Sequence, residues 1–195
     1  MSPTLHITGD ESADRLLADE PLALLIGMLL DQQIAIELAF KGPHRLSERL
    51  GGLDARAIAL LDPEALEAAF REKPALHRFP AAMAKRTQAL CEHLVDEYDG
   101  HVTQLWSEAD DGRDVVRRLR SLPGFGPEKS KIFAALLAKR LGVTPTGWEA
   151  AAAPFSDDEL RSVADLAEPG DLDRLREHRR AQKAAGTDKQ GRPTG

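Results

Sequence analysis

The chain has 195 residues, of which 42% are hydrophobic and 30% charged, which suits one domain or two closely joined lobes around a real core. Cys91 is the only cysteine, so these residues exclude intramolecular disulfides, a cysteine zinc site and any cluster that needs four thiolates. No apolar run approaches the roughly 20 residues of a membrane span, and the first residues lack the pattern of a secretory signal. We therefore expect a cytoplasmic protein without metal, cofactor or membrane contact.

The charge of the chain is distributed unevenly. The net charge of −6 speaks against a nucleic-acid partner. Residues 113–140, however, carry +6 and residues 173–195 carry +4, which leaves −16 for the rest of the chain. Such a chain attracts phosphate at two segments and repels it elsewhere.

The predicted elements are all helices. Ala and Leu dominate, and no alternating apolar segment indicates a strand. Several helix starts carry a first-turn proline, and several ends carry a glycine. In chain order, we predict helices over 21–30, over 34–40 with a break at Gly42-Pro43, over a short piece that ends at 50, and over 63–71, 80–98, 115–119, 127–141 and 174–183.

The sharpest local signal is the turn Leu122-Pro123-Gly124-Phe125-Gly126 between two of these helices. Glycine permits positive φ and lets a ligand approach the backbone. Because the next helix begins at once, its free N–H groups form an anion site that can hold a DNA phosphate. An ordinary turn with Phe125 in the core is the alternative. The residues predicted to contact DNA here are Gly124, Phe125, Gly126, Lys129, Ser130 and Lys131.

Two segments carry a resemblance to a known family. Residues 122–141 (LPGFGPEKSKIFAALLAKRL) resemble the helix-hairpin-helix of the HhH-GPD DNA glycosylase superfamily, which includes endonuclease III and the adenine and alkylpurine glycosylases. Residues 21–40 (PLALLIGMLLDQQIAIELAF) are similar to the superfamily's early helix with its Gln pair. The resemblance implies an all-α fold of two lobes over 1–185, with damaged DNA in the cleft between them. It also implies base excision repair, here without an iron–sulfur cluster. We expect a monomer, associated with the nucleoid, and a disordered tail over 186–195.

Gln32 and Gln33 stand between two apolar helices. In the family, side chains near this point enter the space left by the flipped nucleotide or contact the opposite base. An amide can both donate and accept hydrogen bonds, so it suits base edges left unpaired after extrusion. Two polar residues at a solvated helix junction are the alternative.

The family's chemistry requires a carboxylate. Base release leaves positive charge on the sugar, which a carboxylate stabilises, and a carboxylate can also activate water. Bifunctional members place a nucleophilic lysine six positions after the hairpin leucine, where this chain has Glu128, so we expect no lyase activity. The family's aspartate follows the loop after the hairpin, and here Asp165 is the first candidate and Glu149 the alternative. An ordinary helix cap is the other interpretation of Asp165.

Other polar residues carry weaker signals. His77, His93 and His101 have no metal-ligand spacing, and Arg78, Lys85 and Arg86 are typical of a solvated helix face that can touch the DNA backbone. The sequence thus predicts a monofunctional glycosylase that acts on double-stranded DNA containing a lesion. The alternatives are a non-catalytic binder of distorted DNA and a helical protein-interaction module.

Overall fold

The computed structural model describes residues 4–188 and 192–194. Within them the chain forms eleven α-helices and one short 3-10 helix, and its only extended pairing is an isolated bridge between Thr187 and Pro193. The all-α prediction is therefore confirmed. The elements are α1 (Glu11–Asp19), α2 (Pro21–Leu30), α3 (Ile36–Leu50), α4 (Ala55–Leu60), α5 (Pro63–Arg71), α6 (Pro80–Tyr98), α7 (Gln104–Ser107), α8 (Gly112–Ser121), α9 (Pro127–Leu141), α10 (Trp148–Ala152), η1 (Val163–Asp165) and α11 (Asp171–Ala184).

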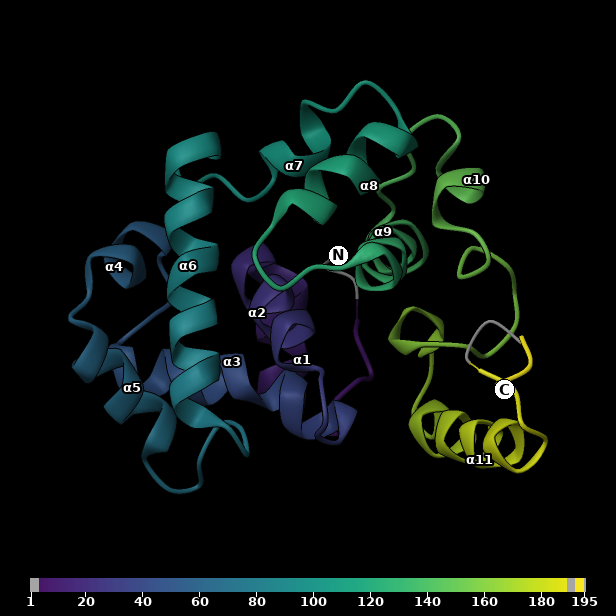
Figure 1. The fold of residues 1–195 in the computed structure, drawn as a ribbon, viewed down its shortest axis with the longest axis horizontal. Helices are drawn as coiled ribbons and strands as arrows, with labels where there is room; N and C mark the ends of the chain where they lie inside the picture. The colour runs from purple at the N-terminus through teal and green to yellow at the C-terminus, as the bar shows by residue number, and fades with distance from the viewer. Residues whose placement is uncertain (1–3, 189–191, 195) are drawn as a thin grey trace.

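The helices form two groups on either side of α2 and α9 (Figure 1). On one side α4 and α5 pack on the long helix α6, and α3 packs on α2. On the other side α8, α10 and η1 pack on α9, and α11 is seen at the lower right of the view. Helix α9 is seen nearly end-on, so the hairpin before it lies at the face turned toward the viewer.

Several local start and stop signals of the sequence act as predicted. Asp62 accepts hydrogen bonds from the Glu64 and Ala65 amides at the start of α5. Gly142 ends α9 with φ +70°, in the left-handed region that glycine tolerates. The helices over 21–30, 63–71, 80–98 and 127–141 have the predicted bounds.

The break predicted at Gly42-Pro43 is wrong. Helix α3 runs without interruption from Ile36 to Leu50 with Pro43 inside it. Gly42 allows α3 to pack closely on α2, because a Cβ at this position would lie 2.6 Å from Leu30 Cδ1. Tertiary contact between α2 and α3 therefore outweighs the local helix-breaking tendency of this dipeptide.

Helices α2 and α9 make up the centre of the core. Residues Leu22 to Leu30 of α2 are all buried, and so are residues Ile132 to Ala138 of α9. Gly27 lets Phe40 pack directly on α2, since an added Cβ would lie 2.6 Å from the Phe40 ring. This burial fixes the C-terminal end of α2 relative to the start of α9, where the candidate site lies.

The end of the chain was predicted to be a disordered tail over 186–195. Residues 189–191 and 195 lie outside the described residues. In the described part, the Thr194 amide donates to the Gly186 carbonyl at 2.7 Å, so the chain folds back on itself after α11. Among the described helices, none has the length and apolar character that crossing a membrane requires.

Candidate nucleic-acid interface

The hairpin between α8 and α9 is a tight turn of the predicted kind. The Phe125 amide donates to the Leu122 carbonyl at 3.1 Å, which closes a four-residue turn with Pro123 and Gly124 at its centre. Gly124 has φ +83°, as the third residue of a type II turn requires. Gly126 is the N-cap of α9, whose first residue is Pro127.

The two hairpin glycines serve different purposes. A Cβ on Gly124 would lie 2.3 Å from Leu29 Cδ1, so this glycine lets the hairpin pack against the end of α2. A Cβ on Gly126 would meet nothing within 4 Å. Across the described residues, neither glycine amide has a hydrogen-bond acceptor. Gly126 therefore keeps the backbone open to a ligand outside the protein, and its amide is available to that ligand.

Phe125 contributes its backbone to the hairpin and its side chain to the core. The side chain is 5% exposed and packs edge-on against Phe133, with ring centroids 6.0 Å apart. Its amide donates to the Leu122 carbonyl within the turn. The predicted contact of Phe125 with DNA therefore remains a prediction.

The three polar residues predicted to support the hairpin all have partners inside the protein. Lys129 Nζ donates to the Met28 carbonyl at 2.6 Å. Ser130 Oγ donates to the Gly126 carbonyl at 2.8 Å, and Lys131 Nζ donates to the Ala153 carbonyl at 3.0 Å. These side chains hold the hairpin in shape, and their predicted contacts with phosphate remain predictions.

The C-terminal end of α2 is stabilised by Lys129. Besides Met28, the ammonium group lies 3.3 Å from the Leu29 carbonyl and 3.4 Å from the Asp31 carbonyl. A cation at this end of a helix interacts favourably with the helix dipole and with the last carbonyls. The first turn of α9 is thereby attached to the end of α2.

Gln32 has a structural role in the Gln loop, which we define as residues 31–35 between α2 and α3. Its Nε2 donates to the Leu29 carbonyl at 2.8 Å, and its Oε1 accepts from Arg86 Nη1 at 2.7 Å. Both ends of this amide are therefore used within the protein. Gln32 shapes the loop, and these two bonds leave one amide N–H and one oxygen lone pair, so its predicted contact with DNA remains a prediction.

Gln33 is the exposed member of the pair. Its φ is +58°, one of two positive values among the described residues other than glycine. A left-handed conformation at a residue with a Cβ costs roughly 1–2 kcal/mol, and such strain concentrates at functional positions. The loop thus presents Gln33 to solvent.

A second exposed loop lies beside the Gln loop. Residues 72–79 between α5 and α6, the Phe79 loop, end in Phe79, whose side chain is 43% exposed. The Arg78 guanidinium lies 4.9 Å from the centre of the Phe79 ring. The sequence did not single out Phe79, because one phenylalanine before a proline has no pattern that distinguishes an exposed ring from a buried one.

His77 connects the two loops. It is 4% exposed, its Nδ1 accepts from the Phe79 amide at 3.1 Å, and its Nε2 lies 2.9 Å from the Gln32 carbonyl. Because Nδ1 accepts, the ring proton lies on Nε2 and is donated to Gln32. Burial lowers the pKa of His77, against the opposing effect of the Gln32 and Leu30 backbone. His77 is therefore neutral and fixed in one tautomer.

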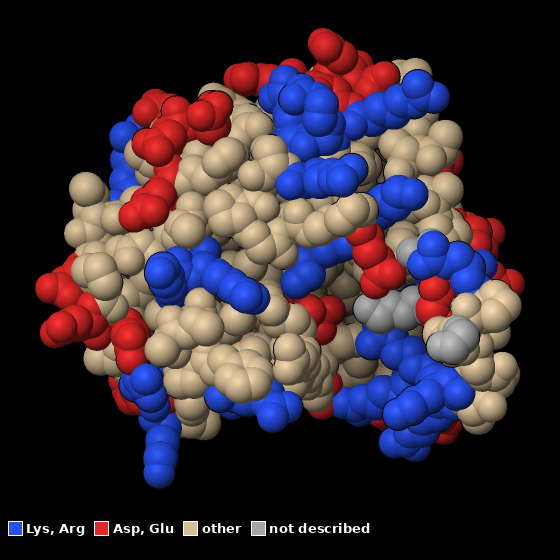
Figure 2. All heavy atoms as spheres, in the orientation of Figure 1, with Lys and Arg blue, Asp and Glu red and all other residues tan. Residues whose placement is uncertain are grey.

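Basic side chains gather on the face that carries these loops. Figure 2 shows Lys and Arg across the upper middle of this face and at the lower right over α11, with acidic groups at the top, left and right edges and a few between the basic groups. Several basic residues of the +6 segment have internal partners, including Arg117 and Arg118, which both bind Asp114. The positive charge of the face therefore comes partly from α6 and α11.

A mixed charge cluster lies where α11 approaches the hairpin. The Arg179 side chain is partly buried, and its Nε finds no hydrogen-bond partner among the described residues. Burial lowers the pKa of Arg179, while the charges of Asp31 and Glu128 act in the opposite direction. The C-terminal helix thus brings a cation to the end of α2 and the first turn of α9.

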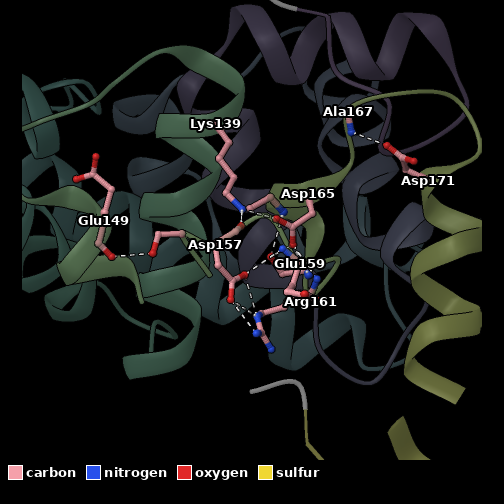
Figure 3. Close-up of polar contacts among 11 residues, drawn as sticks. Lys139, Glu149, Asp157, Glu159, Arg161, Asp165, Ala167 and Asp171 are labelled. Carbon is pink, nitrogen blue, oxygen red and sulfur yellow. Dashed lines mark hydrogen bonds and ion pairs between the residues drawn. The ribbon is translucent and has the colours of Figure 1, made fainter. Parts of the chain in front are cut away.

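Asp165 is bound in an ion pair at the other end of α9 (Figure 3). Its Oδ1 lies 2.5 Å from Lys139 Nζ, and its Oδ2 accepts from the Arg161 and Ser162 amides at 2.9 and 2.8 Å. Together with Ser162 it forms a capping box on η1. The carboxylate is 8% exposed. Lys139 follows Glu128 by eleven residues, roughly 16 Å along the helix axis.

Glu149, the alternative carboxylate, is exposed on the short helix α10. Figure 3 shows its carboxylate pointing away from the Asp165 cluster. Its backbone carbonyl accepts from Ser156 Oγ at 2.7 Å, which ties the end of the loop to α10. The structure therefore brings the hairpin and the Gln pair together, and it places Asp165 on η1 beside Lys139 of α9 and Glu149 on α10.

The residues present do not fit a metal centre. Nowhere in the described ranges do three or more His, Cys, Asp or Glu side chains come together in a group that could hold a metal ion. Cys91 is fully buried in α6, and burial raises the pKa of its thiol to about 12. An iron–sulfur cluster of the four-thiolate kind has no ligands among these residues.

One family of known proteins matches most of this chain. The sequence model described as "HhH-GPD superfamily base excision DNA repair protein" matches residues 26–189, which is most of the chain. No curated protein matches the chain. Two solved structures of endonuclease III with DNA, one a trapped covalent intermediate with an estranged adenine and one a non-covalent complex, are each 22% identical to it. Both alignments cover 80% of this chain and 70% of the other, with TM-scores of 0.45 and 0.47.

Proposed function

Because this chain belongs to the HhH-GPD superfamily of base excision DNA repair proteins, we propose that it is a monofunctional DNA glycosylase, which hydrolyses the N-glycosidic bond of a damaged or mispaired base. One observation carries this proposal. The open hairpin, the exposed Gln33 and the exposed Phe79 all lie around the C-terminal end of α2, on a face rich in basic side chains.

Each part of this face suits one step of binding a damaged duplex. The Gly126 backbone and the N-terminal end of α9 hold a phosphate without reading sequence. Gln33 offers a donor and an acceptor to the base that loses its partner. Phe79 offers a ring that can stack between bases, as apolar wedges do when a duplex is kinked.

The lysine chemistry of bifunctional enzymes has no support here. The sixth position after Leu122 is Glu128. The adjacent Lys129 lies with its ammonium group against three carbonyls at the end of α2. A lysine fixed in this way as a charged donor is not a free amine, so attack on a sugar carbon is disfavoured.

We propose Asp165 as the catalytic carboxylate, with Glu149 as the alternative. Two backbone amides and Lys139 hold Asp165 in one position, as a preorganised group requires. Lys139 also neutralises its charge. A catalytic Asp165 therefore requires Lys139 to release it when DNA binds, whereas an Asp165 that stays paired favours the second candidate function, a non-catalytic binder of distorted DNA.

The test is an excision screen under single-turnover conditions, on duplexes that each carry one damaged base, followed by alkaline cleavage of abasic sites. We expect wild type to excise at least one lesion and Asp165→Asn to be about a hundredfold slower or more. Glu149→Gln is expected to be milder. The opposite ranking assigns the chemistry to Glu149.

A matched control separates chemistry from folding. Asp171 accepts from the Ala167 and Glu168 amides at the start of α11 and pairs with Arg174. Asp171→Asn thus removes a capping charge of the same kind away from Lys139. If wild type excises no lesion but binds an abasic duplex more tightly than an intact one, the non-catalytic binder is the correct description.

A further inference from the structure

We propose that His77 is a positioning residue that joins the Gln loop to the Phe79 loop, so that Gln33 and Phe79 enter damaged DNA as one unit. This inference rests on the proposed function, because it concerns how the same face engages a lesion. It assigns a role to a residue that touches neither DNA nor the reacting atoms.

The His77 ring connects the two loops through both of its nitrogens. One ring nitrogen accepts from the Phe79 backbone and the other donates to the Gln32 backbone. Two residues project from the face. Gln33 directly follows Gln32, whose carbonyl binds His77, and Phe79 is itself the residue whose amide binds His77. A single buried ring thus sets the spacing between both projecting residues.

The rest of the network fixes the Gln loop from the opposite side. Arg86 of α6 donates to Gln32 Oε1, and Gln32 Nε2 donates to the Leu29 carbonyl. Lys129 of α9 donates to the same Leu29 carbonyl. The His77 connection therefore extends to the hairpin, and the phosphate anchor and both projecting residues have one common support.

The connection exists in only one protonation state of the imidazole. A proton on Nδ1 removes the acceptor for the Phe79 amide and places a second donor against it. The charged groups that face His77 are Arg78 of its own loop and Arg86 of α6, and both disfavour a further positive charge. Histidine in the unfolded chain titrates at about pH 6.5, and the pKa in the native state is lower.

The sign of the pH effect follows from this order of pKa values. Between the native and the unfolded pKa the unfolded loop binds more protons than the native loop, so stability rises with pH across this window. The native connection is fully present above about pH 6.5. It weakens as the pH falls from that value through the native pKa of His77.

The experiment compares wild type with His77→Gln and His77→Leu on one probe. The probe is a duplex with a tetrahydrofuran abasic-site analogue and 2-aminopurine opposite it, whose fluorescence rises when a side chain displaces the neighbouring stack. A glutamine can accept from the Phe79 amide and donate to the Gln32 carbonyl without titrating near neutral pH. A leucine can do neither. His101→Gln, at an exposed histidine outside both loops, is the control.

At pH 7.5 we expect wild type, His77→Gln and His101→Gln to give equal fluorescence. His77→Leu loses two hydrogen bonds, so its lesion-dependent affinity is expected to fall roughly tenfold to a hundredfold. Its binding to intact duplex, which depends on phosphate, should be unchanged. As the pH falls below about 6.5 and through the native pKa of His77, the wild-type and His101→Gln signals should fall, while that of His77→Gln should not.

The outcomes separate this inference from the proposed function. If His77→Leu perturbs the probe as wild type does, or if the His77→Gln signal falls with pH like that of wild type, the positioning role is wrong and the glycosylase proposal stands. If wild type perturbs the probe but excises no lesion, the catalytic proposal fails. The role of His77 is then still tested by comparing the probe signals of His77→Leu and His77→Gln with that of wild type. If wild type does not perturb the probe, both fail. Should His77→Leu not fold, the His77→Gln pH profile decides.

Discussion

Replacing Gly126 by valine is expected to weaken duplex binding while the protein stays folded. Gly126 has φ −86° and ψ −178°, an extended conformation that any residue adopts, and an added Cβ meets no atom within 4 Å. Its carbonyl still accepts from the Ser130 amide and hydroxyl in the variant. The free energy of unfolding should therefore fall by no more than about 1 kcal/mol, the cost of a poorer N-cap residue.

The effect on binding is larger because the added methyl groups occupy the approach of the phosphate. A hydrogen bond from a backbone amide to a charged group contributes about 1.5–3 kcal/mol. Its loss corresponds to a weakening of roughly tenfold to over a hundredfold. The lost donor is a neutral amide, so the number of released counterions hardly changes. Affinity should fall equally for all sequences, with the same slope against salt concentration.

Gly124→Ala is the matched comparison, with the opposite expected result. Gly124 has φ +83° and packs so closely that an added Cβ would lie 2.3 Å from the buried Leu29 Cδ1. Left-handed strain costs roughly 1–2 kcal/mol and overpacking a further 1–3 kcal/mol. This variant should lose about 2–5 kcal/mol of the free energy of unfolding in urea.

The assay is fluorescence anisotropy of a labelled duplex at several salt concentrations, with urea unfolding of each variant measured in parallel. A folded Gly126→Val protein that binds DNA as tightly as wild type would refute the assignment of the hairpin as a phosphate anchor. A variant with a reduced salt slope would show that the lost contact was made by a lysine or arginine and not by the backbone.

Three further predictions concern the interior. The side chains of the Asp165–Lys139 ion pair are 8% and 12% exposed. Removing either partner should lower the free energy of unfolding, measured in urea, by about 3 kcal/mol. The double variant should lose less than the sum of the two single losses. Lys129→Met removes the cation at the C-terminal end of α2 and should cost about 1–2 kcal/mol in thermal unfolding, whereas an unchanged midpoint would contradict its capping role. The buried Cys91 thiol, with its pKa raised to about 12, should resist thiol reagents at pH 8 until the protein unfolds, and rapid native labelling would show that α6 opens locally.

The hairpin could be predicted because its structure is determined by adjacent residues. A proline, two glycines and the start of a helix specify a tight turn with open amides wherever they occur together. The partners of the hairpin lysines could not be predicted in this way. Lys129 bonds to Met28, which lies 101 residues earlier in the sequence, and Lys131 to Ala153, which lies 22 residues later. Only packing of α9 beside α2 and α10 brings these carbonyls within reach.

The uninterrupted α3 is a second case in which contacts between distant residues, and not local sequence, determine the structure. Gly42-Pro43 is a strong local signal for a break, and the sequence offers no sign that Gly42 is required by Leu30 of another helix. The exposed ring of Phe79 and the buried ring of His77 were missed for a related reason. Their exposure depends on how α6 lies against the end of α2, and hydrophobic periodicity does not report on single residues in a loop.

The Gln pair shows that residue type alone does not determine which side chain is exposed. Gln32 and Gln33 are chemically identical neighbours, so no property of the side chains distinguishes them. The structure does so through the backbone. Gln32 follows α2 closely enough for its amide to cap Leu29 and meet Arg86, and the left-handed turn at Gln33 then directs the next side chain away from these partners. The difference in exposure between the two side chains is therefore a consequence of one positive φ angle at the end of a buried helix.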